Sequence, residues 1–580
     1  MEPHDLVAEV SQLHARAQTL EVSAEAEEQR LAVAERLSEL RQLYRRNSSA
    51  FSPDVLGMLR EIAGVVGAPA KASEPPAPSQ APEQVLKGVF GYDRFRPGQR
   101  EIIDAVLAGQ DCVGVMPTGS GKSITYQVPA IALGRFALVV SPLIALMKDQ
   151  VDALHEVGVA ATFLNSSLTF DERRERLAGI ASGQYRFVYA APEGLEASVG
   201  RLLSEVRPSL IAIDEAHCIS EWGHDFRPAY RNLSSLKRRF GNVPMLALTA
   251  TATPQVTRDI VQQLGMRGPK LFRGSFFRKN LKLSSFSKGD SLGRTTREAI
   301  ASLVLARPGE SGIVYCLSRK STEETADYLK SQGCKAACYH AGLAPEQRSK
   351  AQDAFRNDDV DVVVATIAFG MGIDKSNVRY VIHRDLPKSV EGYYQEIGRA
   401  GRDGAPSDCI LFYSWSEVVA YDRFADGTED DAAAERLRTQ AREMFRFAEA
   451  SRCRHQLLAE YFGESLQACQ ESCDVCGGKL RLPEKPRKRR RSLEGATTPG
   501  PASAAVMGAS IDGELLTLLK SLRLHLAREN GVPAYLVFND ATLLEMAARK
   551  PKTEAELLQV PGVGPAKLEK YGSAFLKIIR

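Results

Sequence analysis

Val113-Gly114-Val115-Met116 runs directly into Pro117-Thr118-Gly119-Ser120-Gly121-Lys122-Ser123. The first segment is apolar, which predicts a buried strand, and the second is typical of a loop whose backbone N–H groups surround phosphates before a helix begins. We expect Lys122 to contact the β- and γ-phosphates of a nucleotide and the Ser123 hydroxyl to bind Mg²⁺. Met116 stands where the strict pattern has glycine, so a chance glycine-rich turn is the alternative for this segment alone. The other residues expected to bind phosphate are Thr118, Gly119, Ser120 and Gly121.

Two acidic residues follow another predicted strand. Leu210-Ile211-Ala212-Ile213 is apolar and leads into Asp214-Glu215-Ala216-His217. At this place we expect Asp214 to hold Mg²⁺ and Glu215 to orient and deprotonate an attacking water. An acidic loop is the alternative for the second segment alone, and the phosphate-loop pattern makes that alternative remote.

Short β-branched runs alternate with helical stretches from about residue 83 to residue 416. This alternation predicts doubly wound parallel sheets, and its length exceeds one sheet, so we expect two α/β lobes. Helical patterns precede and follow them, separated by a Pro/Ala linker and a basic Pro/Gly linker. The expected parts are a helical N-terminal extension at 1–68, a linker at 69–84, lobe 1 at 85–283, lobe 2 at 284–416, a helical cysteine-containing module at 417–480, a linker at 481–508 and a helical domain at 509–580.

Composition excludes several classes of protein. The chain has 580 residues, of which 44% are hydrophobic and 25% charged, which is unlike a disordered, collagen-like or membrane-embedded chain. It has no run of about 18 apolar residues and no signal-peptide pattern at its start, so we expect a cytoplasmic protein without a membrane partner. Lys and Arg number 75 against 71 Asp and Glu, and this near-balance neither demands nor forbids a nucleic-acid partner.

Four of the ten cysteines lie close together, at Cys453, Cys469, Cys473 and Cys476. Four thiolates within so short a stretch of a cytosolic protein suit tetrahedral Zn²⁺. Free buried thiols are the alternative, and His455 is a possible substitute ligand. We expect the zinc to be structural, because no acid or open coordination position accompanies the cysteines.

As a set, the motifs resemble those of a superfamily-2 helicase and, more narrowly, of the RecQ family. The resemblance implies two tandem RecA-like lobes, a zinc-binding module and a C-terminal HRDC-like domain. It covers about residues 83–476 and the C-terminal helical domain. The motifs that carry it are Gly119-Ser120-Gly121-Lys122-Ser123, Asp214-Glu215-Ala216-His217, Thr249-Ala250-Thr251-Ala252, Gln395-Glu396-Ile397-Gly398-Arg399-Ala400-Gly401-Arg402, Phe90-Gly91-Tyr92 with Phe95-Arg96-Pro97-Gly98-Gln99, and Trp222-Gly223-His224-Asp225-Phe226-Arg227-Pro228.

The resemblance also assigns residues around ATP. It implies that Gln99 reads the adenine edge while Tyr92 and Arg96 stack on its ring, in keeping with the donor–acceptor chemistry of Gln. One or both of the second-lobe residues Arg399 and Arg402 are expected to reach the γ-phosphate as an arginine finger, with a surface ion pair as the alternative. Finally, Asp374 is expected to line the lobe interface near the ribose.

The resemblance places single-stranded DNA near the loop after the catalytic acids. Trp222, His224, Phe226 and Arg227 are expected to meet the strand and to signal to the ATP site, since aromatic side chains stack on bases without regard to sequence. A core-packing role is the alternative for Trp222. By analogy with the family, the residues expected to contact the phosphate backbone are Ser141, Pro142, Leu143, Lys148 and Thr366. The family direction of movement is 3′→5′.

The chain after the cysteine-containing module departs from the usual family pattern. Residues 477–510 leave no room for the winged helix that usually follows the zinc module. Six cations in the seven residues Lys485–Arg491 are expected to grip duplex phosphates instead, with a solvated linker as an equal alternative. In the HRDC-like domain, Tyr535 is expected to stack on a base and Lys567 to contact a phosphate, with docking of a protein as the alternative.

The sequence therefore predicts an ATP- and Mg²⁺-dependent 3′→5′ DNA helicase of the RecQ type with bound Zn²⁺. We expect it to act in recombination, repair and replication on single-stranded and forked DNA, near a bacterial-type nucleoid. Repair proteins are possible partners of the N-terminal extension, which is otherwise expected to self-associate, and of the HRDC-like domain. Two alternative functions are an RNA helicase of the DEAD-box kind and a strand-annealing protein with a regulatory ATPase.

Overall fold

The computed structural model describes residues 3–18, 33, 36–37, 39–40, 44, 51–67, 79–142, 144–195, 206–221, 225–240, 243–289, 292–370, 375–478, 480–483 and 513–580. The chain forms two compact units, Met1–Pro75 and Pro76–Arg580. No helix in the described ranges is long and apolar enough to cross a membrane.

In the described part of the N-terminal unit, helix α1 (Pro3–Gln18) packs against helix α3 (Pro53–Gly67). Val10 of α1 and Val55 and Ile62 of α3 are buried in one apolar cluster. His14 Nε2 lies 2.7 Å from Glu61 Oε2 and links the two helices at their surface. The predicted helical N-terminal extension is confirmed, and its self-association stays a prediction.

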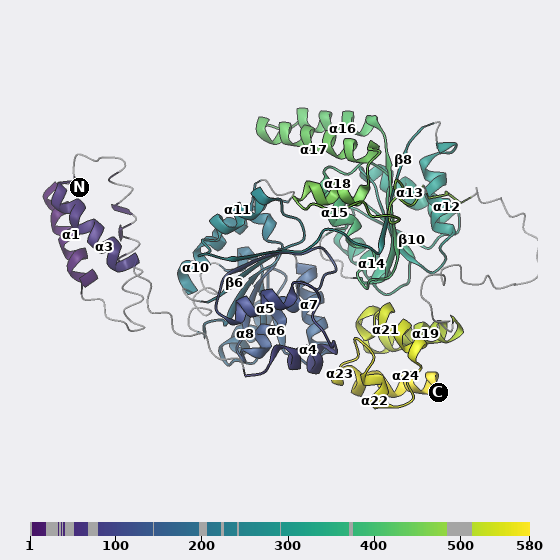
Figure 1. Cartoon of the computed structure of the whole chain (residues 1–580), viewed down its shortest axis with the longest axis horizontal. Helices are drawn as coiled ribbons and strands as arrows, with labels where there is room; N and C mark the ends of the chain where they lie inside the picture. The colour runs from purple at the N-terminus through teal and green to yellow at the C-terminus, as the bar shows by residue number, and fades with distance from the viewer. Residues whose placement is uncertain are drawn as a thin grey trace, which may run out of the picture. The chain divides into compact units, whose positions relative to one another are not determined.

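The first lobe is a seven-stranded parallel sheet in the order β3-β4-β2-β5-β6-β1-β7, with helices on both faces (Figure 1). Its strands are β1 (Cys112–Val115), β2 (Ala137–Val140), β3 (Ala161–Leu164), β4 (Phe187–Ala190), β5 (Leu210–Ile213), β6 (Met245–Thr249) and β7 (Lys270–Arg273). Its helices are α4 (Pro82–Phe90), α5 (Gln99–Leu107), α6 (Ile124–Ala132), α7 (Ile144–Glu156), α8 (Phe170–Ala181), α10 (Ser234–Phe240) and α11 (Pro254–Gln263).

Both faces of this sheet are buried because successive side chains of a strand point in opposite directions. In β1, Val113 and Val115 pack in one core, whereas Cys112 packs in another. Strands buried on both faces are apolar throughout, which is why the sequence shows short apolar runs instead of alternation.

The second lobe repeats this plan with a six-stranded parallel sheet in the order β10-β11-β9-β12-β13-β8. Its strands are β8 (Leu281–Ser287), β9 (Ser311–Tyr315), β10 (Ala336–Tyr339), β11 (Val362–Ala365), β12 (Val378–His383) and β13 (Ser407–Tyr413). Its helices are α12 (Thr296–Leu305), α13 (Arg319–Ser331), α14 (Pro345–Arg356) and α15 (Val390–Ile397). Residues 274–280, between β7 and β8, form the segment that joins the two lobes.

Two helical regions follow the lobes, so the predicted fold class is confirmed. The cysteine-containing module has helices α16 (Trp415–Asp426), α17 (Asp431–Glu449) and α18 (Arg454–Tyr461). Its Cys473 lies in the same buried cluster as Val113 of lobe 1 and Ile313 of lobe 2. The C-terminal domain has helices α19 (Gly513–Asn530), α20 (Ala534–Val537), α21 (Asp540–Arg549), α22 (Glu554–Leu558), α23 (Pro565–Lys567) and α24 (Ser573–Ile579) around its own core.

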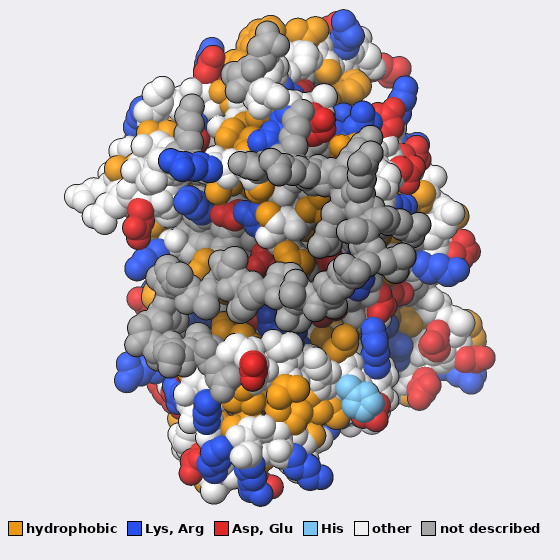
Figure 2. Space-filling model, turned by 90° about the vertical axis from the view of Figure 1, so that its right-hand side faces the viewer, with side chains coloured by type: hydrophobic (Ala, Val, Ile, Leu, Met, Phe, Trp, Pro, Cys, Tyr) orange, Lys and Arg blue, Asp and Glu red, His pale blue; other side chains and the backbone are white. Residues whose placement is uncertain are grey.

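Charges of both signs are interspersed over the face of the molecule drawn in Figure 2. This agrees with the near-balance of 75 basic and 71 acidic residues in the sequence. A DNA path therefore has to be located from particular side chains and not from overall charge.

Candidate nucleotide site and zinc site

The phosphate loop and the acidic pair meet at one edge of the first sheet. The loop follows β1 and Asp214 follows β5, while β6, which ends at Thr249, lies between those two strands. All three strands are parallel, so their carboxyl ends lie at the same edge. This is the edge where open α/β sheets bind ligands.

The phosphate loop holds a conformation that glycine permits. Gly119 and Gly121 have φ angles of 82° and 80°, which lie in the left-handed region. A Cβ atom at Gly121 would lie 2.6 Å from Gln99 Nε2, so a larger residue would collide there. The glycines that the sequence pattern marks are therefore required by the backbone itself.

The side chains of Gln99 and Arg96 donate hydrogen bonds to backbone carbonyls of this loop. Gln99 Nε2 donates to Ser120 O at 3.1 Å and to Gly121 O at 3.0 Å, and its Oε1 accepts from Arg96 N at 2.8 Å. Arg96 Nη1 donates to Gly119 O. The sequence did not anticipate these bonds to the loop, and the adenine contacts of both residues stay predictions.

The acidic pair is partly buried, and its two carboxylates repel each other. Burial and the neighbouring Glu215 carboxylate together raise the pKa of Asp214 to about 6, and Lys122 opposes this shift. Glu215 has a φ of 47°, a conformation that is costly outside glycine and concentrates at functional sites. A divalent cation between these oxygens would relieve the repulsion, so the donor set fits Mg²⁺.

A polar chain that sequence reasoning missed connects the acidic pair to β6. His217 is fully buried, and its Nδ1 lies 3.3 Å from Glu215 Oε2 and 2.9 Å from Thr249 Oγ1. The Thr249 hydroxyl in turn donates to Thr251 O at 3.3 Å. Both motifs were visible in the sequence, but nothing in it pairs a histidine with a threonine 32 residues away.

The second lobe brings two arginines to the phosphate loop from the turn after α15. Arg399 is 4% exposed, and its Nε has no hydrogen-bond partner among the described residues. A Cβ atom on Gly398 would lie 2.9 Å from the Thr118 side chain, and one on Gly119 would lie 3.3 Å from Arg402 Cα. The lobes are thus in direct contact where hydrolysis is expected.

One cavity of about 670 Å³ collects most of the predicted nucleotide-site residues. Ser120 is in the loop but does not line it, and Asp374 lies outside the described residues. The predicted residues that line it are Tyr92, Arg96, Gln99, Thr118, Gly119, Gly121, Lys122, Ser123, Asp214, Glu215, Arg399 and Arg402.

The C-terminal domain lines the same cavity with Tyr535 and Lys567. Lys567 Nζ donates to Leu536 O at 2.6 Å, and burial lowers the pKa of this lysine to about 8. The structure thus places both predicted DNA contacts beside the helicase lobes, and their binding of DNA stays a prediction.

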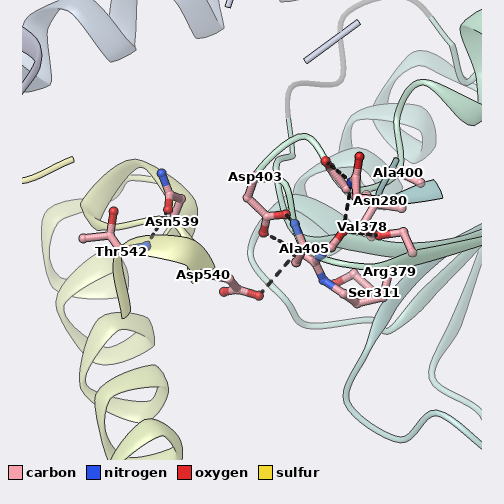
Figure 3. A network of polar contacts seen from close by, with 12 residues as sticks. Asn280, Ser311, Val378, Arg379, Ala400, Asp403, Ala405, Asn539, Asp540 and Thr542 are labelled. Atoms are coloured by element: carbon pink, nitrogen blue, oxygen red, sulfur yellow. Dashed lines mark hydrogen bonds and ion pairs between the residues drawn. The ribbon is translucent and has the colours of Figure 1, made fainter. Parts of the chain in front are cut away.

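This domain touches both lobes. Gly562 N donates to Gly91 O at 3.2 Å in lobe 1. On the other side, Asp540 lies 3.8 Å from Arg379 of lobe 2, which also pairs with Asp403 (Figure 3). Both contacts are polar, and neither follows from any local sequence pattern.

Only part of the proposed DNA loop is described. Trp222 and His224, like Leu143, lie outside the described residues. Phe226 is partly exposed, with the Arg231 guanidinium 5.0 Å from its ring centroid. Arg227 is held by Asp225 at 3.2 Å and donates to Pro142 O at 2.9 Å. Arg227 thereby connects this loop to Pro142, one of the predicted backbone contacts.

The remaining predicted backbone contacts differ in how accessible they are. Ser141 is only 1% exposed, whereas Lys148 is at the surface, where its Nζ lies 2.8 Å from Asp152 Oδ2. Thr366 directly follows β11, and its Oγ1 accepts from Ala368 N at 3.4 Å. Contact of these side chains with a phosphate backbone stays a prediction.

The four cysteines predicted as ligands do come together. The Sγ atoms of Cys453, Cys469, Cys473 and Cys476 all lie within 4.8 Å of one another. Sulfur atoms at tetrahedral positions around Zn²⁺ lie about 3.8 Å apart, so a small contraction completes the site. Burial and the neighbouring thiols raise the pKa of Cys476 to about 11, and a bound cation would displace that proton.

His455 is not part of this cluster. Its Nε2 lies 3.1 Å from both Leu281 O and Ser472 O, so it serves as a donor to backbone carbonyls. Asp474, between two of the cysteines, accepts from Ser285 N at 3.0 Å and pairs with buried Arg454 at 3.0 Å. The metal site is therefore attached to β8, the edge strand of the second sheet.

The zinc module also packs against the segment that joins the lobes and accepts hydrogen bonds from it. Phe462 stacks on Phe276 with ring centroids 4.3 Å apart. Glu464 accepts from Ser275 Oγ and from Phe276 N, each at 2.6 Å. Folding of the module and the position of the interlobe segment are thus physically linked.

Comparison with known proteins gives four matches in the order that the structure shows. The matching family models are DEAD/DEAH box helicase at residues 96–260, Helicase conserved C-terminal domain at 295–404, RecQ zinc-binding at 415–477 and HRDC domain at 512–579. These matches confirm the zinc-binding assignment of the cysteine module.

Curated relatives agree with these matches. The ATP-dependent DNA helicase RecQ of Pasteurella multocida is 37% identical to this chain, covering 86% of it and 93% of the relative. The protein of the same name from Bacillus subtilis is 35% identical, covering 86% of this chain and 98% of its own length. The family resemblance read from the motifs is confirmed, and the chain belongs to the RecQ family of ATP-dependent DNA helicases.

Proposed function

We propose that this protein is an ATP-dependent DNA helicase that moves 3′→5′ on single-stranded DNA and separates duplex strands during recombination and repair. The observation that carries the proposal is that Lys122 of one lobe and Arg399 and Arg402 of the other line a single cavity. A nucleotide bound between two lobes couples its hydrolysis to their separation, and alternating grip on a strand then gives directed movement.

Within this cavity each residue has a chemical role. Lys122 holds the β- and γ-phosphates, and Glu215 orients the attacking water and accepts its proton. Arg399 and Arg402 both line the cavity, and one or both would stabilise the charge of the transition state as an arginine finger. Ser123 and Asp214 would hold Mg²⁺, which supplies charge neutralisation at the phosphate oxygens.

A route for signalling from DNA to ATP runs through the residues after Asp214. The loop that carries Phe226 comes soon after Glu215 and His217 in the sequence, and these two residues are in polar contact with each other and, through His217, with Thr249. A base stacked on this loop would move the segment that carries the catalytic base. Trp222 and His224 belong to the same proposed contact by their position in the sequence.

Forked DNA is the proposed substrate, and the cytoplasm, at the nucleoid of a bacterial-type cell, is the proposed place of action. The RecQ zinc-binding match ends at 477 and the HRDC match begins at 512, so strand separation would rely on the lobes, the basic linker and the HRDC domain. Repair proteins are proposed partners of the N-terminal unit or the HRDC domain.

Unwinding of labelled forks tests the function directly. With ATP and Mg²⁺ we expect strand separation on a duplex with a 3′ tail and little on one with a 5′ tail, and neither with a non-hydrolysable analogue. Annealing without unwinding would favour the strand-annealing alternative. Stronger stimulation of ATPase by RNA than by DNA would favour an RNA helicase.

A further inference from the structure

The segment between the lobes contains a half-buried arginine that the motifs leave without a role. Arg278 lies between β7 and β8, and its Nη1 donates to Thr118 O in the phosphate loop at 2.6 Å. Its Nη2 donates to Ala400 O at 3.1 Å and to Gly401 O at 2.8 Å. One guanidinium therefore joins the phosphate loop to the turn between Arg399 and Arg402.

Among the described residues, the hydrogen-bond partners of Arg278 are all neutral. Its Nε donates to Asn280 Oδ1 at 3.3 Å, and no carboxylate forms an ion pair with it within the described ranges. Burial lowers its pKa, and the cations Arg402 and Arg96 lower it further. A charge kept in so unfavourable a place, satisfied only by loop carbonyls, points to a function in the loops it holds.

Asn280 fixes the same turn from the other side. Its Nδ2 donates to Gly401 O and Ala405 O, each at 2.9 Å (Figure 3). Gly401 has a φ of 56°, and a Cβ atom there would lie 2.3 Å from Asn280 Nδ2. The turn that carries the two arginines is thus shaped to fit the interlobe segment closely.

We propose that Arg278 is a positioning residue for ATP hydrolysis, which ties the phosphate loop to the arginine-bearing turn so that Arg399 and Arg402 reach the phosphates in register. This rests on the proposed function. It implies that Arg278 acts on the rate of the chemical step more than on nucleotide affinity, because it touches loop carbonyls and does not line the cavity.

The chain offers a matched control at the end of β7, directly before this segment. Arg273 is similarly half-buried and also donates to backbone carbonyls, to Ala252 O at 3.0 Å and to Phe462 O at 2.7 Å. These carbonyls belong to lobe 1 and the zinc module and not to the phosphate loop. Arg273→Lys therefore reports the general cost of changing an arginine beside the interlobe segment.

The test compares full-length Arg278→Lys with Arg273→Lys and the unmodified protein. Lysine keeps the charge but cannot bridge three carbonyls in a fixed fork. We expect kcat of DNA-stimulated ATPase in Arg278→Lys to fall on the order of 10–100-fold. The Kd for a fluorescent ATP analogue should change less than about threefold, as should kcat in Arg273→Lys, with equal thermal midpoints as the folding check.

A double-mutant cycle makes the test independent of folding. If Arg278 acts through the arginine turn, Arg278→Lys combined with Arg402→Lys should lower kcat by clearly less than the product of the single effects. Near-normal kcat in Arg278→Lys, an equal loss in Arg273→Lys, or a parallel loss of ATP binding would overturn the positioning role. An unmodified protein without ATPase would overturn the proposed function itself.

Discussion

The zinc site is formed by residues close together in the sequence, whereas the nucleotide cavity is formed by residues far apart in it. The cysteine ligands lie between residues 453 and 476, within one module. The cavity instead combines Lys122 and Asp214 of lobe 1 with Arg399 of lobe 2. A local site can assemble with its own module, whereas a composite site exists only when the lobes meet, so only the latter can turn lobe movement into catalysis.

The two sites nevertheless meet at the interlobe segment 274–280. The zinc module holds its first half through Phe462 and Glu464, and the arginine turn holds its second half through Arg278. Damage to the zinc site should therefore act on stability first, while damage to the cavity should act on catalysis alone. The following predictions test that separation.

The largest effect is expected from Lys122→Ala. Lys122 is the one cation within the loop segment Pro117–Ser123, so ATP hydrolysis should fall by on the order of 10³-fold or more. DNA binding and thermal stability should stay near those of the unmodified protein. Lys320→Ala, at an 84% exposed side chain in lobe 2, is the control, and wild-type ATPase in Lys122→Ala would refute the site.

Cys473→Ser tests the zinc site, because it removes one of the four cysteine ligands. Because metal-binding free energy is folding free energy in such modules, zinc content should fall below half and the thermal midpoint by about 5–10 °C. ATPase should fall in proportion to the unfolded fraction. Cys334→Ser changes a free, partly buried thiol outside the cluster and should leave zinc content intact, and full zinc in Cys473→Ser would remove that residue from the site.

Phe226→Ala should separate DNA sensing from hydrolysis. Loss of one base-stacking contact of about 1–3 kcal/mol should reduce stimulation of ATPase by single-stranded DNA roughly tenfold, with unwinding reduced more than DNA binding. Trp222→Ala should behave alike. Phe170→Ala in the same lobe, at a 79% exposed side chain, is the control, and unchanged stimulation in both loop variants would return the loop to a core-packing role.

The smallest effect is expected from the basic linker. Changing Arg487, Lys488, Arg489, Arg490 and Arg491 to Gln should weaken fork binding and leave DNA-saturated ATPase unaltered. Each lost phosphate contact should flatten the log–log salt dependence by roughly 0.9 on duplex and 0.7 on single strands. A shortened linker that keeps the charges is the comparison; if shortening is harmful and the Gln variant keeps its slope, the linker is a tether.

The sequence by itself determined the parts whose chemistry is local. Three motifs can be recognised within short segments: Lys122 with its glycines, the Asp214–Glu215 pair and the four cysteines. A phosphate loop, a strand-end carboxylate and a metal chelate each require a fixed spacing of residues. The same holds for the two lobes, since strands buried on both faces leave apolar runs between helices.

Only the tertiary structure decided which distant groups touch. The bonds of Gln99 to the phosphate loop, the contact of His217 with Thr249, the three carbonyls around Arg278 and the place of Tyr535 beside the lobes all depend on elements brought together by folding. Hydrogen bonds to backbone carbonyls leave no residue pattern at the acceptor, because every residue has a carbonyl. Such contacts are invisible in one sequence, and they are where the coupling between the lobes resides.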